Sequence, residues 1–138
     1  MPDTRTAGAH VLRKWLEADG WSASETTEGR RKVFHAHRNG VRRIVRYTTR
    51  SSGDFQLSTV NNHAPLNRDD HFWAFVDLAG REPSVTVLLE DDARAFFKAE
   101  HENYLASHGG HRPENDNSDH QGLTDAQMSR MLRRSRTW

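Results

Sequence analysis

Four histidines lie within twenty residues of each other in the last third of the chain, and their ring nitrogens could bind zinc. They are His101, His108, His111 and His120. Imidazole nitrogen is a common ligand of tetrahedral zinc, which needs four donors. The 138 residues hold nine histidines in all, so this group is little denser than chance, and Gly109-Gly110 also suits a helix end. We expect no bound metal and no cofactor, with zinc at these histidines as the alternative.

Basic side chains recur at alternate positions around Asn39-Gly40, the residue pair that most favours a two-residue hairpin turn. The pattern predicts a hairpin of strands 31–38 and 41–50, in which alternate side chains share a face. Because arginine forks match the geometry of phosphate, one face could contact nucleic acid. The candidate residues on it are Arg31, Arg42, Arg46, Arg50, His35 and His37. The alternative is a charged sheet face that is merely solvated.

The opposite face of the same hairpin offers no ligand for a hard cation. It would pair Phe34 with Val45 and Lys32 with Tyr47. Magnesium takes oxygen ligands, chiefly carboxylates, phosphates and water. Apolar and aromatic side chains at these positions therefore predict a filled surface in place of a metal site.

The remaining pattern predicts helices and strands in one α/β chain. A helix over 9–18 precedes a short strand over 21–26 and then the hairpin. Residues 51–70 are polar and interrupted by Pro65, which indicates a long loop. Two apolar runs, 71–78 and 84–89, are typical of buried strands. A helix capped by Asp91 or Asp92 should run to about Ser107. Its apolar side chains would be Ala95, Phe96, Ala99 and Leu105.

A polar loop over 108–122 and a short helix would complete the chain. Thr124 and Gln127 have the spacing of a capping box, which opens that helix. Further candidate nucleic-acid contacts follow at its end: Arg133, Arg134 and Arg136. A large aromatic side chain such as Trp138 tends to dock, either on the domain itself or on a partner.

The element order and two stretches of sequence resemble the PD-(D/E)XK, or restriction-endonuclease-like, nuclease superfamily. Residues 70–78, DHFWAFVDL, resemble the strand DxFWVFVDL of uncharacterised bacterial proteins grouped with that fold, and residues 101–120 resemble their downstream motif. The resemblance covers about residues 8–123. It implies a single restriction-endonuclease-like α/β (α+β) domain over 1–123, with an N-terminal helix, a β-meander containing the hairpin, two further buried strands and C-terminal helices. Residues 124–138 would form the short helix and an arginine-rich tail. It also implies that the loop histidines make hydrogen bonds to the body of the domain.

The resemblance also implies where such a nuclease would hold its metal. The superfamily signature needs an acidic residue near the first helix, an Asp early in the second strand and (D/E)-x-Lys on the third. These carboxylates hold Mg²⁺ beside the scissile phosphate. The matching positions here are Ala9, Lys32, Val45 and Tyr47. None of them is a carboxylate, so the resemblance implies a degenerate motif without catalytic residues.

Charge is unevenly distributed along the chain, although the net charge is only +1. Residues 1–50 carry eleven Lys/Arg and five Asp/Glu, whereas residues 51–125 carry five and fourteen. Contact with a polyanion is therefore expected on one face only. The absence of Cys excludes disulfides and thiolate metal sites. No apolar run approaches the roughly 20 residues that cross a bilayer, and no apolar leader is present, so we expect a cytoplasmic protein without membrane partners.

These patterns favour a catalytically inactive nuclease-fold protein that acts as a nucleic-acid-binding or regulatory module through its basic hairpin face. One alternative is an accessory subunit that binds a protein partner through the acidic half and the C-terminal tail. Another is a metal-dependent nuclease with a relocated site, built from Asp54, Asp69, Asp70 or Asp77.

Overall fold

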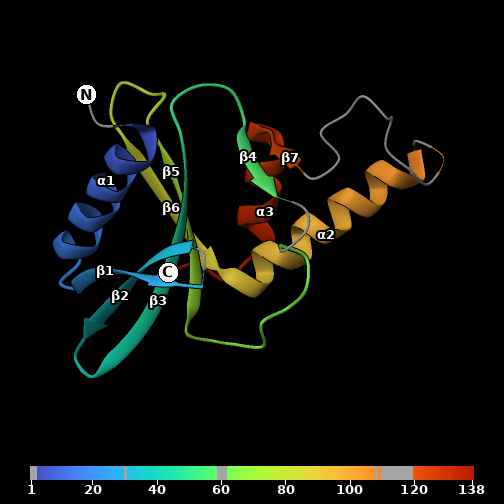
Figure 1. Ribbon diagram of the computed structural model, residues 1–138. Helices are drawn as coiled ribbons and strands as arrows, with labels where there is room; N and C mark the ends of the chain where they lie inside the picture. Colours follow the sequence, from blue (N-terminus) through green and yellow to red (C-terminus); the bar gives the residue numbers. More distant parts are fainter. Residues whose placement is uncertain (1–2, 30, 59–61, 108, 110–119) are drawn as a thin grey trace.

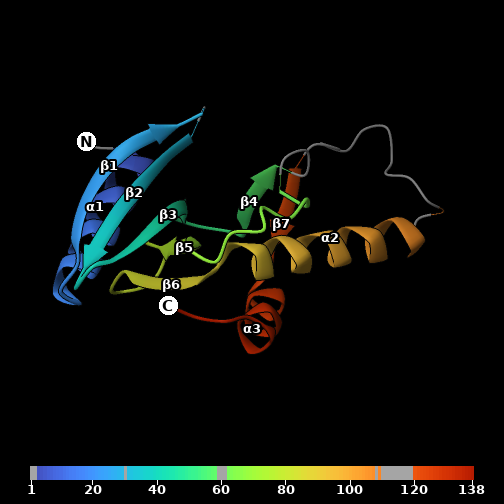
Figure 2. The same cartoon turned by 90° about the horizontal axis from the view of Figure 1, so that it is seen from below.

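The computed structural model describes residues 3–29, 31–58, 62–107, 109 and 120–138. Its elements in chain order are α1 (Thr4–Ala18), β1 (Ser22–Glu28), β2 (Arg31–Arg38), β3 (Val41–Arg50), β4 (Phe55–Ser58), β5 (His71–Asp77), β6 (Ser84–Leu89), α2 (Glu90–Ser107), β7 (His120–Leu123) and α3 (Asp125–Arg134). A five-stranded sheet in the order β1-β2-β3-β5-β6 forms the centre, with α1 on one face and α2 and α3 on the other (Figure 1, Figure 2). The predicted α/β (α+β) class is confirmed.

The predicted hairpin is confirmed in its bounds, its turn and its register. Asn39 and Gly40 have φ angles of 50° and 78°, as the predicted two-residue turn requires. Phe34 lies opposite Val45 on one face, and His37 lies opposite Arg42 on the other. The local sequence determines this hairpin, because the Asn39-Gly40 turn and the alternation of side chains specify the same register.

The two apolar runs form neighbouring strands at the other half of the sheet. β3 pairs with β5 in parallel, and β5 pairs with β6 in antiparallel orientation. Residues 71–76 of β5 are all buried, as a strand covered on both faces requires. β6 differs from the prediction, because only its last three residues, 87–89, are buried.

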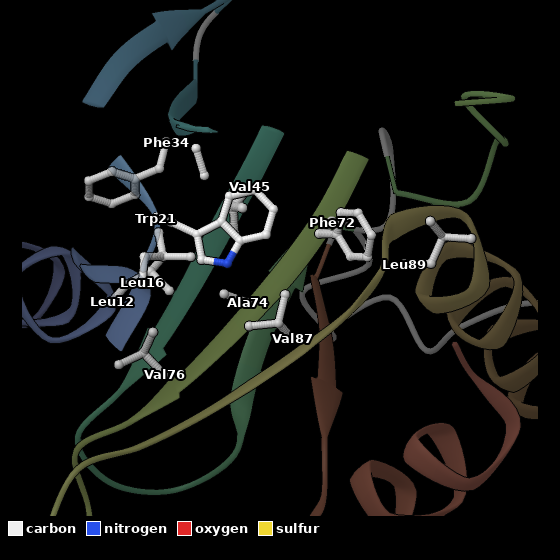
Figure 3. Close-up of a cluster of buried hydrophobic side chains, with 11 residues drawn as sticks. Leu12, Leu16, Trp21, Phe34, Val45, Phe72, Ala74, Val76, Val87 and Leu89 are labelled. Atoms are coloured by element: carbon white, nitrogen blue, oxygen red, sulfur yellow. The ribbon is translucent and has the colours of Figure 1, made fainter. Parts of the chain in front are cut away.

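Helix α1 covers one face of the sheet and begins earlier than predicted. The Asp3 carboxylate accepts a hydrogen bond from the backbone N–H of Thr6 at 2.7 Å and caps the helix, so Ala9 is not its start. The first turn of α1 is polar and has no apolar periodicity, so the sequence pattern did not predict it. Leu12 and Leu16 of α1 pack in the cluster that contains Phe34, Val45 and Trp21 (Figure 3).

The segment predicted as one long loop over 51–70 contains a strand. β4 pairs in antiparallel orientation with β7, whose residues the sequence assigned to a second loop. Phe55 and Leu57 of β4 are buried with Leu123 of β7 in the cluster under α2. Each strand has only four residues, and such a short alternation gives no periodic signal.

Helix α2 begins at Glu90, directly after β6, so the predicted cap at Asp91 or Asp92 is wrong. Asp91 instead accepts hydrogen bonds from the backbone of the 62–70 segment, and Asp92 accepts one from the backbone N–H of Arg136. The buried apolar residues of α2 are Ala93, Phe96 and Phe97. Of the predicted set, Phe96 is buried, Leu105 is half-buried, and Ala95 and Ala99 are exposed.

The C-terminal helix α3 opens with the predicted capping box. The Thr124 hydroxyl accepts a hydrogen bond from the Gln127 N–H, and the Gln127 side chain accepts one from the Thr124 N–H. The last residues then return to the sheet, where the Leu89 N–H donates to the Arg136 carbonyl and the Trp138 N–H donates to the Val87 carbonyl. The tail thus pairs with the outer edge of β6. No helix in the described ranges is long and apolar enough to cross a bilayer.

Candidate nucleic-acid interface

The hairpin face that would hold a metal in a PD-(D/E)XK nuclease is packed beneath a helix. Phe34 and Val45 have no exposed surface, and both belong to the cluster covered by Leu12 and Leu16 of α1. Tyr47 is half-buried, and its hydroxyl donates a hydrogen bond to Glu25 at 2.6 Å. Burial, followed by this bond to Glu25, raises the pKa of Tyr47 to about 12, so the phenol stays protonated at neutral pH.

The remaining motif positions lie at the margins of that face. Ala9 is a half-buried residue of α1, and Lys32 is exposed on β2. Neither can supply a carboxylate.

Some of the predicted basic side chains on the opposite face are exposed, and others form salt bridges with carboxylates. Arg42 is 54% exposed and lies 3.4 Å from Asp70, His37 is exposed, and His35 is half-buried. Arg50 is engaged: it contacts Asp77 at 2.7 Å and Asp125 at 2.9 Å, and its guanidinium lies over the Phe55 ring. Its hydrogen bond to Asp77 raises the pKa of Arg50 and lowers that of Asp77. Arg50 therefore stabilises the junction of β3, β5 and α3.

A buried carboxylate joins two arginines of the same face. The Glu90 side chain is 1% exposed, and its Oε2 lies 2.8 Å from Arg94, 3.1 Å from Arg31 and 3.4 Å from Arg46. The Arg46 guanidinium also lies 3.7 Å from the centre of the Trp73 ring. Burial lowers the pKa of Arg46 to about 10 although Glu90 opposes the shift, so Arg46 remains charged at neutral pH.

Four cations converge at the open end of the hairpin, where β3 continues beyond its last pair with β2 (Figure 1). The cavity there has a volume of about 350 Å³. We call it the basic notch. It is lined by Thr4, Arg5, Arg31, Lys32, Arg46, Tyr47, Thr48 and Thr49. None of the described residues that line it is acidic, and the hydroxyls add hydrogen-bonding groups, so its chemistry suits an anion such as phosphate.

The arginines of the C-terminal segment lie on another part of the molecule. Arg133 and Arg134 are exposed at the end of α3, and Arg136 contacts Asp92. Figure 2 shows α3 at the bottom of the view, and the end of β1 and the start of β2, whose first residues line the basic notch, at the top. Trp138 docks on its own chain, with its ring centre 4.7 Å from that of Trp21. The structure thus separates these arginines from Arg31 and Arg46.

The candidate metal ligands do not assemble within the described residues. His101 lies beside His63, with ring centres 5.2 Å apart, whereas the side chains of His108, His111 and His120 fall outside the described part of the chain. In that part, no group of three or more His, Asp or Glu could hold a metal ion.

The aspartates of the relocated-nuclease hypothesis lie at the two ends of β5 and before β4. Asp54 is exposed before β4, Asp69 is exposed in the segment before β5, Asp70 directly precedes β5, and Asp77 ends that strand. Asp70 accepts a bond from the His71 ring and is 3.4 Å from Arg42, and the bond from His71 chiefly lowers its pKa.

Sequence reasoning identified two cations of the basic notch and missed two as binding residues. Arg31 and Arg46 were predicted from the alternation of the hairpin, and Lys32 was noted only as a position of the nuclease motif. Arg5 was missed because the helix was expected to start at Ala9. An N-cap prediction at Asp3, followed three residues later by Thr6, would have brought Arg5 onto the helix.

Comparison of the chain with protein-family models, with curated proteins and with solved structures found no match.

Proposed function

We propose that this protein is a non-catalytic nucleic-acid-binding module with a restriction-endonuclease-like fold, and that it binds phosphates in the basic notch. The observation that carries the proposal is the convergence of Arg5, Arg31, Lys32 and Arg46 in one cavity. Arg31 and Arg46 also contact the buried Glu90, whereas Arg5 and Lys32 are exposed. Such side chains bind the phosphate backbone of DNA or RNA and release its counterions, which gives affinity without sequence preference.

The filled hairpin face supports the non-catalytic part of the proposal. Val45 stands at a position where the resemblance implies a metal-binding carboxylate, Phe34 is its partner on β2, and both are buried in the cluster with Leu12 and Leu16 of α1. A two-metal or one-metal nuclease needs carboxylates beside the scissile phosphate. A plasmid incubated with the protein and Mg²⁺ or Mn²⁺ should stay intact, and EDTA-sensitive cutting would contradict this part.

The exposed side of the hairpin extends the proposed contact surface. His37 and Arg42 are exposed there, and Arg31 connects this side with the basic notch. Arg50 is left out of the proposed contacts, because it does not line the basic notch and Asp77 and Asp125 engage its guanidinium. Arg31 and Arg46 line the notch but also contact Glu90, so the exposed Arg5 and Lys32 carry the charge that no salt bridge engages within the described residues. A nucleic-acid ligand is compatible with the cytoplasmic location that we propose.

Two exposed cations of the basic notch allow a direct test. Neither Arg5 nor Lys32 forms a salt bridge within the described residues, so the double variant Arg5→Gln/Lys32→Gln removes charge without breaking an ion pair. The matched control is Lys14→Gln/Lys98→Gln, which removes two exposed charges outside the notch. Binding of a labelled oligonucleotide is measured by fluorescence anisotropy at about 50 mM and about 200 mM salt.

The proposal predicts different salt dependences for the two double variants. Each lost phosphate contact makes the slope of log K against log salt shallower by about 0.7 for a single strand, so the notch variant should lose about 1.4. Its affinity at about 50 mM salt should fall about tenfold or more, while the control variant keeps most of the wild-type affinity. Equal behaviour of the two variants, or no binding by the wild type at the lower salt concentration, would refute the proposal.

A further inference from the structure

A second pocket shares Arg31 with the basic notch but has a different lining. It is a cavity of about 350 Å³ between the hairpin and the segment before β5, and we call it the side pocket. It is lined by Glu28, Arg31, Ile44, Leu66, Arg68 and His71. Two aliphatic side chains lie among four polar ones, and the volume is within the range of sites for small organic groups, which begin at about 300 Å³. The two cavities therefore have a common wall but different chemistry.

The outer wall of the side pocket is held in place by hydrogen bonds. The Asp91 carboxylate accepts from the backbone N–H groups of Leu66 at 2.7 Å and Asn67 at 2.8 Å. The Arg94 guanidinium donates to the carbonyl of Ala64 at 3.0 Å. A wall fixed in this way costs little ordering entropy when a ligand enters. This arrangement also gives Asp91 a role that helix capping does not explain.

The floor of the pocket carries a histidine with a fixed ring. The His71 side chain is 8% exposed, its Nδ1 lies 2.8 Å from Asp70, and its Nε2 lies 3.6 Å from Glu28. The bond to Asp70 fixes the ring orientation, as a carboxylate partner does for other oriented histidines. Ile44, 6% exposed, lies opposite His71 on the neighbouring strand and adds an aliphatic surface.

We propose that the side pocket takes one unpaired base of a nucleic-acid strand whose phosphate lies in the basic notch. This inference rests on the proposed function and narrows its ligand to single-stranded nucleic acid. Ile44 and Leu66 contact the face of the base, and the polar groups of Arg31, Arg68 and Glu28 meet its edge. Bases within a duplex are stacked and paired, so their faces cannot contact the side pocket, whereas unpaired bases can be turned out.

Three measurements test the inference on the full chain. The first compares a labelled single strand with its duplex at the same salt concentration, and we expect about tenfold tighter binding of the single strand. The second uses Leu66→Ala, with the exposed Leu132→Ala on α3 as the matched control. Leu66→Ala should weaken single-strand binding about fivefold and leave duplex binding unchanged. Arg68→Gln, a change at an exposed side chain, provides a second variant if Leu66→Ala does not fold.

The third measurement distinguishes a base from a bare phosphate. A nucleoside monophosphate should displace the labelled strand at a lower concentration than inorganic phosphate does. Equal displacement, equal affinity for single strand and duplex, or wild-type affinity of the Leu66 and Arg68 variants would each overturn the inference. In those cases the charge-removal experiment still decides the proposed function separately, because it depends on Arg5 and Lys32 alone.

Discussion

Replacement of Glu90 by glutamine should destabilise the fold more than the replacement of any exposed charged side chain. The carboxylate is almost fully buried and contacts Arg94, Arg31 and Arg46 within 3.4 Å. The amide in the Glu90→Gln variant keeps the shape of the carboxylate but loses its charge, so Arg46 and Arg94 would lose the carboxylate that they share, while Arg31 would keep only Glu28 at 3.7 Å. Removing one partner of a buried ion pair costs about 3–5 kcal/mol. We expect a loss of this size in the free energy of unfolding, with most of it from the well-buried Arg46 and Arg94.

Urea denaturation followed by tryptophan fluorescence measures this loss. With a slope of about 1.5 kcal/mol/M, the midpoint should fall by roughly 2–3 M. The matched control is Glu100→Gln, because Glu100 lies 2.7 Å from Arg130 but this pair is partly exposed. An exposed pair contributes at most about 1 kcal/mol. If Glu90→Gln lowered the stability no more than Glu100→Gln does, the buried carboxylate would not compensate the three arginines, and the reasoning would be wrong. A variant that fails to fold is the extreme of the expected result.

Three further changes probe the packing and the ion pairs. Gly8→Ala would place a methyl group against the Thr49 side chain, so we expect about 1–3 kcal/mol of destabilisation in thermal melts. The double variant with Thr49→Ala should recover part of this loss, because it removes the contacts with Oγ1 and Cγ2 and keeps the one with Cβ. No change in the melting temperature of the single variant would contradict the close packing of α1. Trp138→Ala should cost about 2 kcal/mol, because the ring packs on Trp21 and is only half-buried; an unchanged urea midpoint would show that the docked tail adds no stability. Hydrogen bonds in the fold lower the pKa of Asp77 below its unfolded value, so its stabilising effect is complete at neutral pH and is lost as the pH falls below about 4. Asp77→Asn should therefore lower stability at pH 7 and weaken its decline in acid, and parallel pH curves for the two proteins would contradict this.

The sequence predicted those parts of the fold whose signals are local. Asn39-Gly40 specifies both the turn and the register of the hairpin, and Thr124 with Gln127 specifies the start of α3. β4 and β7 could not be found in this way, because Phe55 is paired with Leu123, far along the chain. Each strand is stable only in the presence of the other, and neither has a pattern of its own.

The alternation of side chains along a strand predicted which face each arginine of the candidate site occupies, but not what it contacts there. Alternation placed Arg46 and Arg50 on one face, and both side chains do leave the sheet on that face. It could not show that α2 brings Glu90 to Arg46, or that β5 brings Asp77 to Arg50. An arginine row in a sequence therefore overstates the free cationic surface wherever another element supplies a carboxylate.

The hydrogen bonds that join Leu89 to Arg136 and Trp138 to Val87 also affect how molecules of this protein contact each other. A strand at the rim of a sheet offers unpaired backbone groups to any neighbouring chain, and proteins protect such rims by covering them. Here residues 136–138 cover part of the outer edge of β6, and the Trp138 ring packs against Trp15, Trp21 and Phe72. A variant that lacks residues 136–138 would expose the backbone groups of Val87 and Leu89 together with the Trp21 ring, so we expect its molecules to associate in concentrated solution.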